Sequence, residues 1–402
     1  MSVPSPSHVT VVGLGADGWA GLPESTRERV RAAAVLVGGD RHLALVPEVE
    51  GQARHRLPSP LRDGLAGLLG RIGDLPVVVL ASGDPFVSGI GSTLVDLFGA
   101  GSLEVVPAVS SVSLARARMG WPSESAEVVT VVGRDVHVVL RHLAPEHRLL
   151  VLSSDETTPA EVAALLEASG YGESRVTVLG DLGGAAESRV EGTAATWSAE
   201  VSRLNVVVLE LRGPVVGSWS SGLPDDVFEH DGQLTKRDLR ASALARLAPQ
   251  PGQLLWDVGA GAGSVGIEWM RAHPTCSTVA VEVDADRADR IRRNASSLGV
   301  PTLQVVHGRA PEVLESLADP DAVFVGGGAT LPGVVQGCLD RLRPGGRLVV
   351  HGVTLETEAL LAELFARHGG ELTRIAVEHA SPIGGFTGWS PARTVTQWAV
   401  TR

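Results

Sequence analysis

The sequence predicts an α/β protein of two domains. A chain of 402 residues is longer than one hydrophobic core usually organises. Short apolar runs alternate with segments of helical periodicity along its whole length, and one break in composition falls near the middle. The apolar runs lack polar alternation, which indicates strands buried on both faces and is typical of parallel sheets.

Seven strands are expected in the first half. They are Val9–Leu14, Pro76–Ala81, Leu103–Pro107, Glu127–Val132, Arg148–Ser153, Arg175–Leu179 and Asn205–Leu211. The intervening helices are expected at Glu24–Val35, Leu61–Ile72, Ile90–Phe98, Val109–Ala117 and Pro159–Ala168.

The composition changes at Gly213–Asp225, which reads GPVVGSWSSGLPD and is rich in Gly, Ser and Pro. Such a stretch before a new α/β series is typical of an interdomain linker. The sequence therefore predicts domains at residues 1–213 and 225–402, joined by a linker at residues 214–224. A long surface loop within one domain is the alternative.

The second half opens with a helix expected at Thr235–Ala248, whose T-x-x-D start resembles a capping box. Five strands follow, at Gln253–Val258, Thr278–Val283, Leu303–His307, Ala322–Val325 and Arg347–Val350. Two last stretches, Leu372–Glu378 and Thr394–Val400, have no helix between them. We expect them to form an antiparallel hairpin that closes a parallel sheet.

Composition excludes several classes of protein. The net charge of -12 and the aromatic content of 4% argue against a nucleic-acid partner. No apolar run reaches membrane-spanning length, and the N-terminus lacks a secretion signal, so a soluble cytoplasmic protein without membrane contact is expected. Cys276 and Cys338 lie in apolar surroundings and are expected to be free thiols, and no metal-ligand cluster is evident.

The segment WDVGAGAGSVG at residues 256–266 joins a buried strand to a helix, and Glu282 follows at the end of the next strand. Glycines allow close approach of a ligand, and a strand-end carboxylate can accept ribose hydroxyls. A dinucleotide fingerprint would have glycine where this chain has Ser264. S-adenosylmethionine has a cationic amino group that Asp257 could attract, so this cofactor is favoured over a nicotinamide dinucleotide. A turn that binds no ligand is the remaining alternative.

The run FEHDGQLTKRDLR at residues 228–240, together with this glycine loop and HGRAPEVL, resembles the precorrin methyltransferase domain that also decarboxylates. The resemblance covers nearly all of residues 225–402. It implies a Rossmann-like class I methyltransferase domain whose cofactor contacts are Thr235, Gly259, Ala260, Gly261, Ala262, Gly263, Glu282 and Ala310. Gly327 could line the substrate crevice, and Arg237, Arg240 and Arg393 are candidates for binding substrate carboxylates.

Four motifs of the first half, GLGADGW, SGDP, PAVSS and ARMGWP, together resemble the tetrapyrrole methyltransferase family, particularly its member acting at carbon 5 of precorrin rings. The resemblance covers residues 8–212 and implies two α/β lobes with S-adenosylmethionine between them. It also implies that Gly13, Gly15, Gly83 and Asp84 line the donor or substrate cleft. A simple turn before Pro85 is the alternative role for Asp84.

The two resemblances together imply a bifunctional enzyme of cobalamin synthesis. It would methylate a precorrin-6 macrocycle at carbons 5 and 15 and remove carbon dioxide from the ring C acetate, with one S-adenosylmethionine site in each domain. No catalytic residue is identified, and self-association is expected. A non-catalytic tetrapyrrole- or nucleotide-binding regulator and a nicotinamide-dependent reductase are the alternatives.

Overall fold

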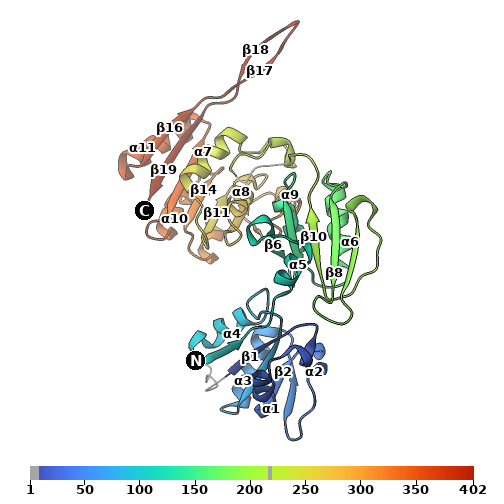
Figure 1. The fold of residues 1–402 in the computed structure, drawn as a ribbon. Helices are drawn as coiled ribbons and strands as arrows, with labels where there is room; N and C mark the ends of the chain where they lie inside the picture. Colours follow the sequence, from blue (N-terminus) through green and yellow to red (C-terminus); the bar gives the residue numbers. More distant parts are fainter. Residues whose placement is uncertain (1–8, 216–219) are drawn as a thin grey trace. The chain divides into compact units, whose positions relative to one another are not determined.

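The computed structural model describes residues 9–215 and 220–402, and its fold is α/β (Figure 1). The chain divides into two compact units, of which the first comprises residues 1–136 and 145–214. The second comprises residues 215–402 together with the short segment 137–144, an addition that the sequence pattern did not indicate.

The first sheet of the first unit is wholly parallel, as predicted, with the order β3-β2-β4-β1-β5. Its strands are β1 (Val9–Leu14), β2 (Val35–Gly38), β3 (Ala53–Arg56), β4 (Val77–Ser82) and β5 (Leu103–Val106). Its helices are α1 (Glu24–Ala32), α2 (Asp40–Ala44), α3 (Leu61–Ile72) and α4 (Gly91–Phe98). The sequence pattern missed β2 and β3, because the predicted helix Glu24–Val35 ends at Ala32 and β3 is a polar edge strand.

The second sheet of the first unit corrects the expectation of parallel strands. Its order is β6-β7-β10-β8-β9, and β10 is antiparallel to both of its neighbours. The strands are β6 (Glu127–Thr130), β7 (Arg148–Leu152), β8 (Arg175–Gly180), β9 (Ser188–Thr193) and β10 (Asn205–Glu210), with helices α5 (Ser111–Met119) and α6 (Thr158–Ala168). In β10, residues 205–209 are all buried. A continuous apolar run therefore indicates that a strand is buried on both faces, but it does not indicate whether the strand is parallel or antiparallel to its neighbours.

The second unit has a seven-stranded sheet of order β13-β12-β11-β14-β15-β19-β16. Its strands are β11 (Leu254–Val258), β12 (Ser277–Glu282), β13 (Gln304–His307), β14 (Ala322–Val325), β15 (Arg347–Gly352), β16 (Glu371–Ile375) and β19 (Val395–Thr401). The helices are α7 (Arg237–Leu247), α8 (Ser264–Ala272), α9 (Ala285–Ser297), α10 (Val334–Arg341) and α11 (Leu355–His368). The first five strands in this order are parallel, and β19 pairs antiparallel with both β15 and β16, which confirms the predicted sheet.

The link between β16 and β19 is not the simple hairpin that the sequence suggested. It contains a separate two-stranded sheet of β17 (Glu378–Ile383) and β18 (Phe386–Pro391). Figure 1 shows this arm extending away from the sheet of its own unit. At its tip, 84% of Phe386 is exposed. The segment contains several Gly and Pro residues, so its pattern does not predict strands.

Both cysteines are free and buried, as expected. Within residues 9–215 and 220–402, no helix combines the length and the apolar character needed to cross a bilayer.

Candidate functional site

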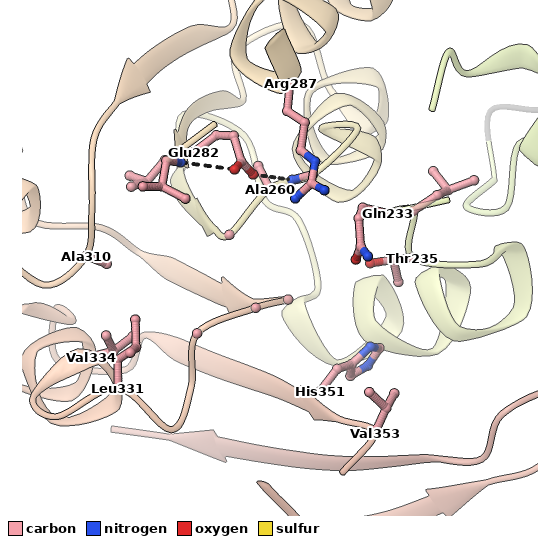
Figure 2. A pocket seen from close by; sticks show the side chains of 18 of the residues that line it. Gln233, Thr235, Ala260, Glu282, Arg287, Ala310, Leu331, Val334, His351 and Val353 are labelled. Carbon is pink, nitrogen blue, oxygen red and sulfur yellow. Dashed lines mark hydrogen bonds between the residues drawn. The ribbon is translucent and has the colours of Figure 1, made fainter. Parts of the chain in front are cut away.

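A cavity of about 360 Å³ opens in the second unit at the carboxyl ends of its parallel strands. Strand order reverses between β11 and β14, and ligands of open α/β sheets bind at such a point. Residues that follow β11, β12, β13, β14 and β15 line it, together with residues 232–236 before α7 (Figure 2). Its volume lies within the range of small-molecule pockets.

The loop after β11 is restricted to glycine at two cavity-lining positions. Gly259 and Gly261 have φ values of 68° and 59°, in the left-handed region that side chains disfavour. A Cβ atom at Gly259 would lie 2.8 Å from the backbone nitrogen of Gly327, and one at Gly261 would lie 2.8 Å from the carbonyl oxygen of Gln233. The backbone of this loop therefore packs against the backbone of Gly327 on one side and against that of Gln233 on the other.

Glu282 ends β12 and lies against this loop (Figure 2). Its Oε2 accepts a hydrogen bond from the Gly261 nitrogen at 2.9 Å. Its Oε1 accepts from the nitrogens of Val283 and Asp284, both at 3.0 Å. A carboxylate has about four acceptor positions, so the backbone fixes the side chain and leaves room for a hydrogen bond from a ligand hydroxyl.

The structure brings most of the predicted second-half residues to this cavity. They are Thr235, Gly259, Ala260, Gly261, Glu282, Ala310 and Gly327. Ala262 and Gly263 do not line it: Ala262 is buried and its carbonyl accepts from the Asn294 side chain at 2.9 Å, while Gly263 precedes the first residue of α8. Whether these residues bind a cofactor stays a prediction.

The capping-box prediction at Thr235 is wrong. Helix α7 begins at Arg237 with Lys236 at the N-cap, and no side chain caps it. Thr235 lies outside the helix and lines the cavity.

Asp257 does not face the cavity, so the expected attraction of a ligand amino group by its carboxylate is not supported. The side chain is 1% exposed and its Oδ2 accepts from the Gly266 nitrogen at 2.9 Å, within helix α8. Its Oδ1 has no hydrogen-bond partner among the described residues. Asp257 therefore links β11 to the first turn of α8 by a hydrogen bond and does not contact the cavity.

Burial raises the pKa of Asp257 from 3.8 to about 7, against the lowering effect of the Gly266 hydrogen bond. The folded state binds the Asp257 proton more tightly than the unfolded state does. Binding of this proton therefore adds to the free energy of unfolding at low pH, and the contribution is lost as the pH rises from about 4 to 7. Relative to Asp257→Asn, the wild type should lose on the order of 4 kcal/mol of unfolding free energy over that range. Urea unfolding of both proteins at several pH values measures this, and parallel pH profiles would contradict it.

The arginines predicted to bind substrate carboxylates do not line the cavity. The prediction for Arg240 is wrong, because its side chain is fully buried and its Nε lies 2.5 Å from Oε1 of Glu268. Its other nitrogens bond Asp225 and the carbonyl oxygens of Thr235 and Leu223. Arg237 and Arg393 are exposed but lie outside the lining.

Four basic side chains that line the cavity were not among the predicted site residues. Lys236, Arg287 and Arg309 bring positive charge to the cavity, and His351 brings an imidazole from the end of β15. Lys236 and Arg287 have carboxylate partners in Asp225 and Asp231. Arg309 is exposed and has no ion pair within the described part of the chain. A single basic or imidazole side chain near a strand end carries no sequence signal that separates it from an ordinary surface residue.

In the first unit, the predicted residues Gly13 and Gly83 lie together. A Cβ atom at Gly13 would lie 1.9 Å from the Gly83 carbonyl oxygen. The Gly83 nitrogen donates to the Leu14 carbonyl at 2.8 Å, and the Gly83 carbonyl accepts from the Ala108 nitrogen at 3.1 Å. The turns that follow β1, β4 and β5 therefore form one continuous backbone surface.

The two other predicted residues of the first unit take part in local turns. The Gly15 carbonyl accepts from the Gly18 nitrogen at 3.2 Å. Oδ1 of Asp84 accepts from the Phe86 nitrogen at 2.8 Å, which supports its alternative role in the turn. Next to this turn, the Ser82 hydroxyl lies 2.9 Å from Nε2 of His42, a contact that the sequence did not suggest.

Comparison with known proteins matches both halves. A family described as tetrapyrrole (corrin/porphyrin) methylases matches residues 8–197. A family described as precorrin methyltransferase domain matches residues 226–402. These matches confirm the two resemblances drawn from the sequence motifs.

Relatives also match along nearly the whole chain. A precorrin-6Y C(5,15)-methyltransferase (decarboxylating) of Sinorhizobium sp. is 46% identical over 98% of this chain and 96% of its own length. The protein of the same description from Mycobacterium tuberculosis is 45% identical, over 98% of this chain and 100% of its own.

A solved structure, the C-terminal domain of precorrin-6Y C5,15-methyltransferase from Rhodobacter capsulatus, is 44% identical and covers 46% of this chain and 100% of its own, with a TM-score of 0.44. By its identity to the full-length relatives, the chain belongs to the precorrin-6Y C5,15-methyltransferase (decarboxylating) family.

Proposed function

We propose that this protein methylates carbons 5 and 15 of a precorrin-6 macrocycle and removes the carboxyl group of the ring C acetate, in cobalamin synthesis. The observation that carries the proposal is the 46% identity to a relative of that description over 98% of the chain, both halves included. The cavity at the carboxyl ends of β11, β12 and β14 supports it, because it gathers most of the second-half residues that the family resemblance implies.

S-adenosylmethionine fits the second-unit cavity as cofactor. When bound, it supplies an electrophilic methyl group. Gly259, Ala260 and Gly261 would offer close backbone approach, and Glu282 would accept a hydrogen bond from the ribose. Ser264 is buried at the start of α8, where a dinucleotide fingerprint would have glycine, so the nicotinamide alternative is disfavoured.

A second cofactor site is proposed in the first unit, so that each domain uses one S-adenosylmethionine. The backbone surface formed by Gly13, Leu14 and Gly83 supports this, because closely packed glycine turns at strand ends leave backbone groups close to a ligand. Gly15 and Asp84 are proposed to contribute from the adjoining turns.

The proposed substrate carries several carboxylates, and the cations at the cavity rim are suited to bind them. Arg309→Gln should raise the substrate KM roughly tenfold, the equivalent of about 1.5 kcal/mol for one charge-assisted hydrogen bond. The control is Arg367→Gln, which removes an exposed arginine of α11 that pairs with Glu363. Steady-state kinetics would contradict the assignment if both variants had the wild-type KM.

The direct test is to incubate the protein with S-adenosylmethionine and a precorrin-6 substrate and to weigh the product. Gain of two methyl groups with loss of one carboxyl group is the expected result. A substrate recovered unchanged would favour the non-catalytic regulator, and reduction dependent on a nicotinamide would favour the reductase. The cytoplasmic location and self-association of the protein stay predictions.

A further inference from the structure

His351 is the imidazole among the residues that line the second-unit cavity. It stands one residue before the end of β15, so its strand holds it at the same edge of the sheet as the glycine loop. In Figure 2 it lies across the cavity from Glu282, near Thr235 and Val353. His351 and Glu282 therefore lie on opposite sides of one cavity.

The His351 ring is held in place by two neighbours. Its Nε2 lies 2.8 Å from Oε1 of Gln397, the residue opposite it on β19, and Gln397 is fully buried. Its ring meets Phe324 edge to face at a centroid distance of 5.0 Å. Because Gln397 engages Nε2, Nδ1 is the nitrogen available for proton exchange with a ligand.

The other ionisable side chains at the cavity are less suited to proton exchange. The guanidinium groups of Arg287 and Arg309 stay protonated in proteins, and the ammonium group of Lys236 lies 3.6 Å from its carboxylate partner Asp225. Glu282 accepts three backbone hydrogen bonds, which hold its carboxylate in place. Burial lowers the pKa of His351 from 6.5 to about 4, so its ring is neutral at physiological pH and, once protonated, gives up the proton more readily than an ordinary imidazolium.

The decarboxylation step of the proposed reaction needs a side chain that can accept a proton and then release it. As carbon dioxide leaves, the bond between the carboxyl carbon and the exocyclic carbon breaks and its electron pair enters the macrocycle. The exocyclic carbon must then take up one proton to become a methyl group. Methyl transfer to a ring carbon that bears hydrogen releases one proton when the double bond is restored, so the two steps balance.

We propose that His351 carries this proton, taking it up at Nδ1 after methyl transfer to carbon 15 and delivering it to the carbon that has lost carbon dioxide. The inference rests on the proposed function and adds to it the residue that couples the two steps. Gln397 is a positioning residue that orients the ring.

His351→Gln in the full-length chain tests the inference, because glutamine can still bond Gln397 but cannot exchange a proton near neutral pH. His379→Gln, at an exposed position of β17, is the matched control. With S-adenosylmethionine and a precorrin-6 substrate, His351→Gln should still form the new bond at carbon 15, because His351 acts only after methyl transfer, but it should decarboxylate at least about 100-fold more slowly. Its product would be one carboxyl group heavier than that of the wild type and of the control, and S-adenosylhomocysteine affinity should not change.

Decarboxylation by His351→Gln within a few-fold of the wild type would overturn the inference. So would an equal loss of methyl transfer at carbon 15 and decarboxylation, which a purely structural role would produce. A wild-type protein that neither methylates nor decarboxylates would overturn the proposed function, and the inference with it.

Discussion

Gly261→Val should abolish S-adenosylhomocysteine binding in the second unit and spare it in the first. The residue has a φ of 59°, and a Cβ atom would lie 2.8 Å from the Gln233 carbonyl oxygen. A branched side chain would displace the loop and break the 2.9 Å hydrogen bond from Gly261 to Glu282. Calorimetric titration should show two sites per wild-type chain and one per variant chain.

Gly384→Val is the matched control for the backbone strain in this variant. Gly384 has a φ of 58°, but its Cβ position meets no atom within 4 Å and it lies in the turn between β17 and β18. Two sites should survive in the control. Two sites in Gly261→Val as well would show that the loop after β11 does not form the cofactor site.

Glu268→Ala should destabilise the second unit by about 3–5 kcal/mol, the usual cost of leaving a buried charge unpaired. Arg240 is fully buried and Glu268 is 5% exposed, and their charged atoms lie 2.5 Å apart. Glu268 also accepts from the nitrogens of Gly222 and Leu223, at 2.6 and 2.9 Å. The substitution therefore leaves a guanidinium and two backbone donors without their partner. Urea unfolding measures the loss.

The double variant Arg240→Met with Glu268→Ala separates the charge effect from the packing effect. Removing both charges should recover part of the stability lost in Glu268→Ala, because no unpaired guanidinium remains. A single variant within about 1 kcal/mol of the wild type would contradict the assignment of a buried pair.

The fold could be predicted largely from local patterns, because strands buried on both faces leave continuous apolar runs. The failures have physical causes. Val35–Gly38 is a four-residue strand that follows its helix after two residues, so the two patterns merged. The β17–β18 arm packs on no described core, and its residues therefore show no burial pattern.

The glycine loop and Glu282 could be predicted because they follow two consecutive strands of the chain in a recognisable sequence pattern. Arg240 was misassigned because its buried partner, Glu268, lies on the next helix and cannot be inferred from the charge pattern of α7. His351 and Arg309 were missed because only the folding of separate strands brings them to the cavity.

We propose that Gly259, Ala260 and Gly261, in the loop after β11, form an S-adenosylmethionine site together with Glu282. A crystal structure of the protein with S-adenosylhomocysteine tests it most directly. The expected result is a nucleoside in the second-unit cavity, with its ribose hydrogen-bonded to Glu282. An empty cavity at saturating ligand, or a preference for a dinucleotide whose pyrophosphate lies on the loop, would contradict the claim.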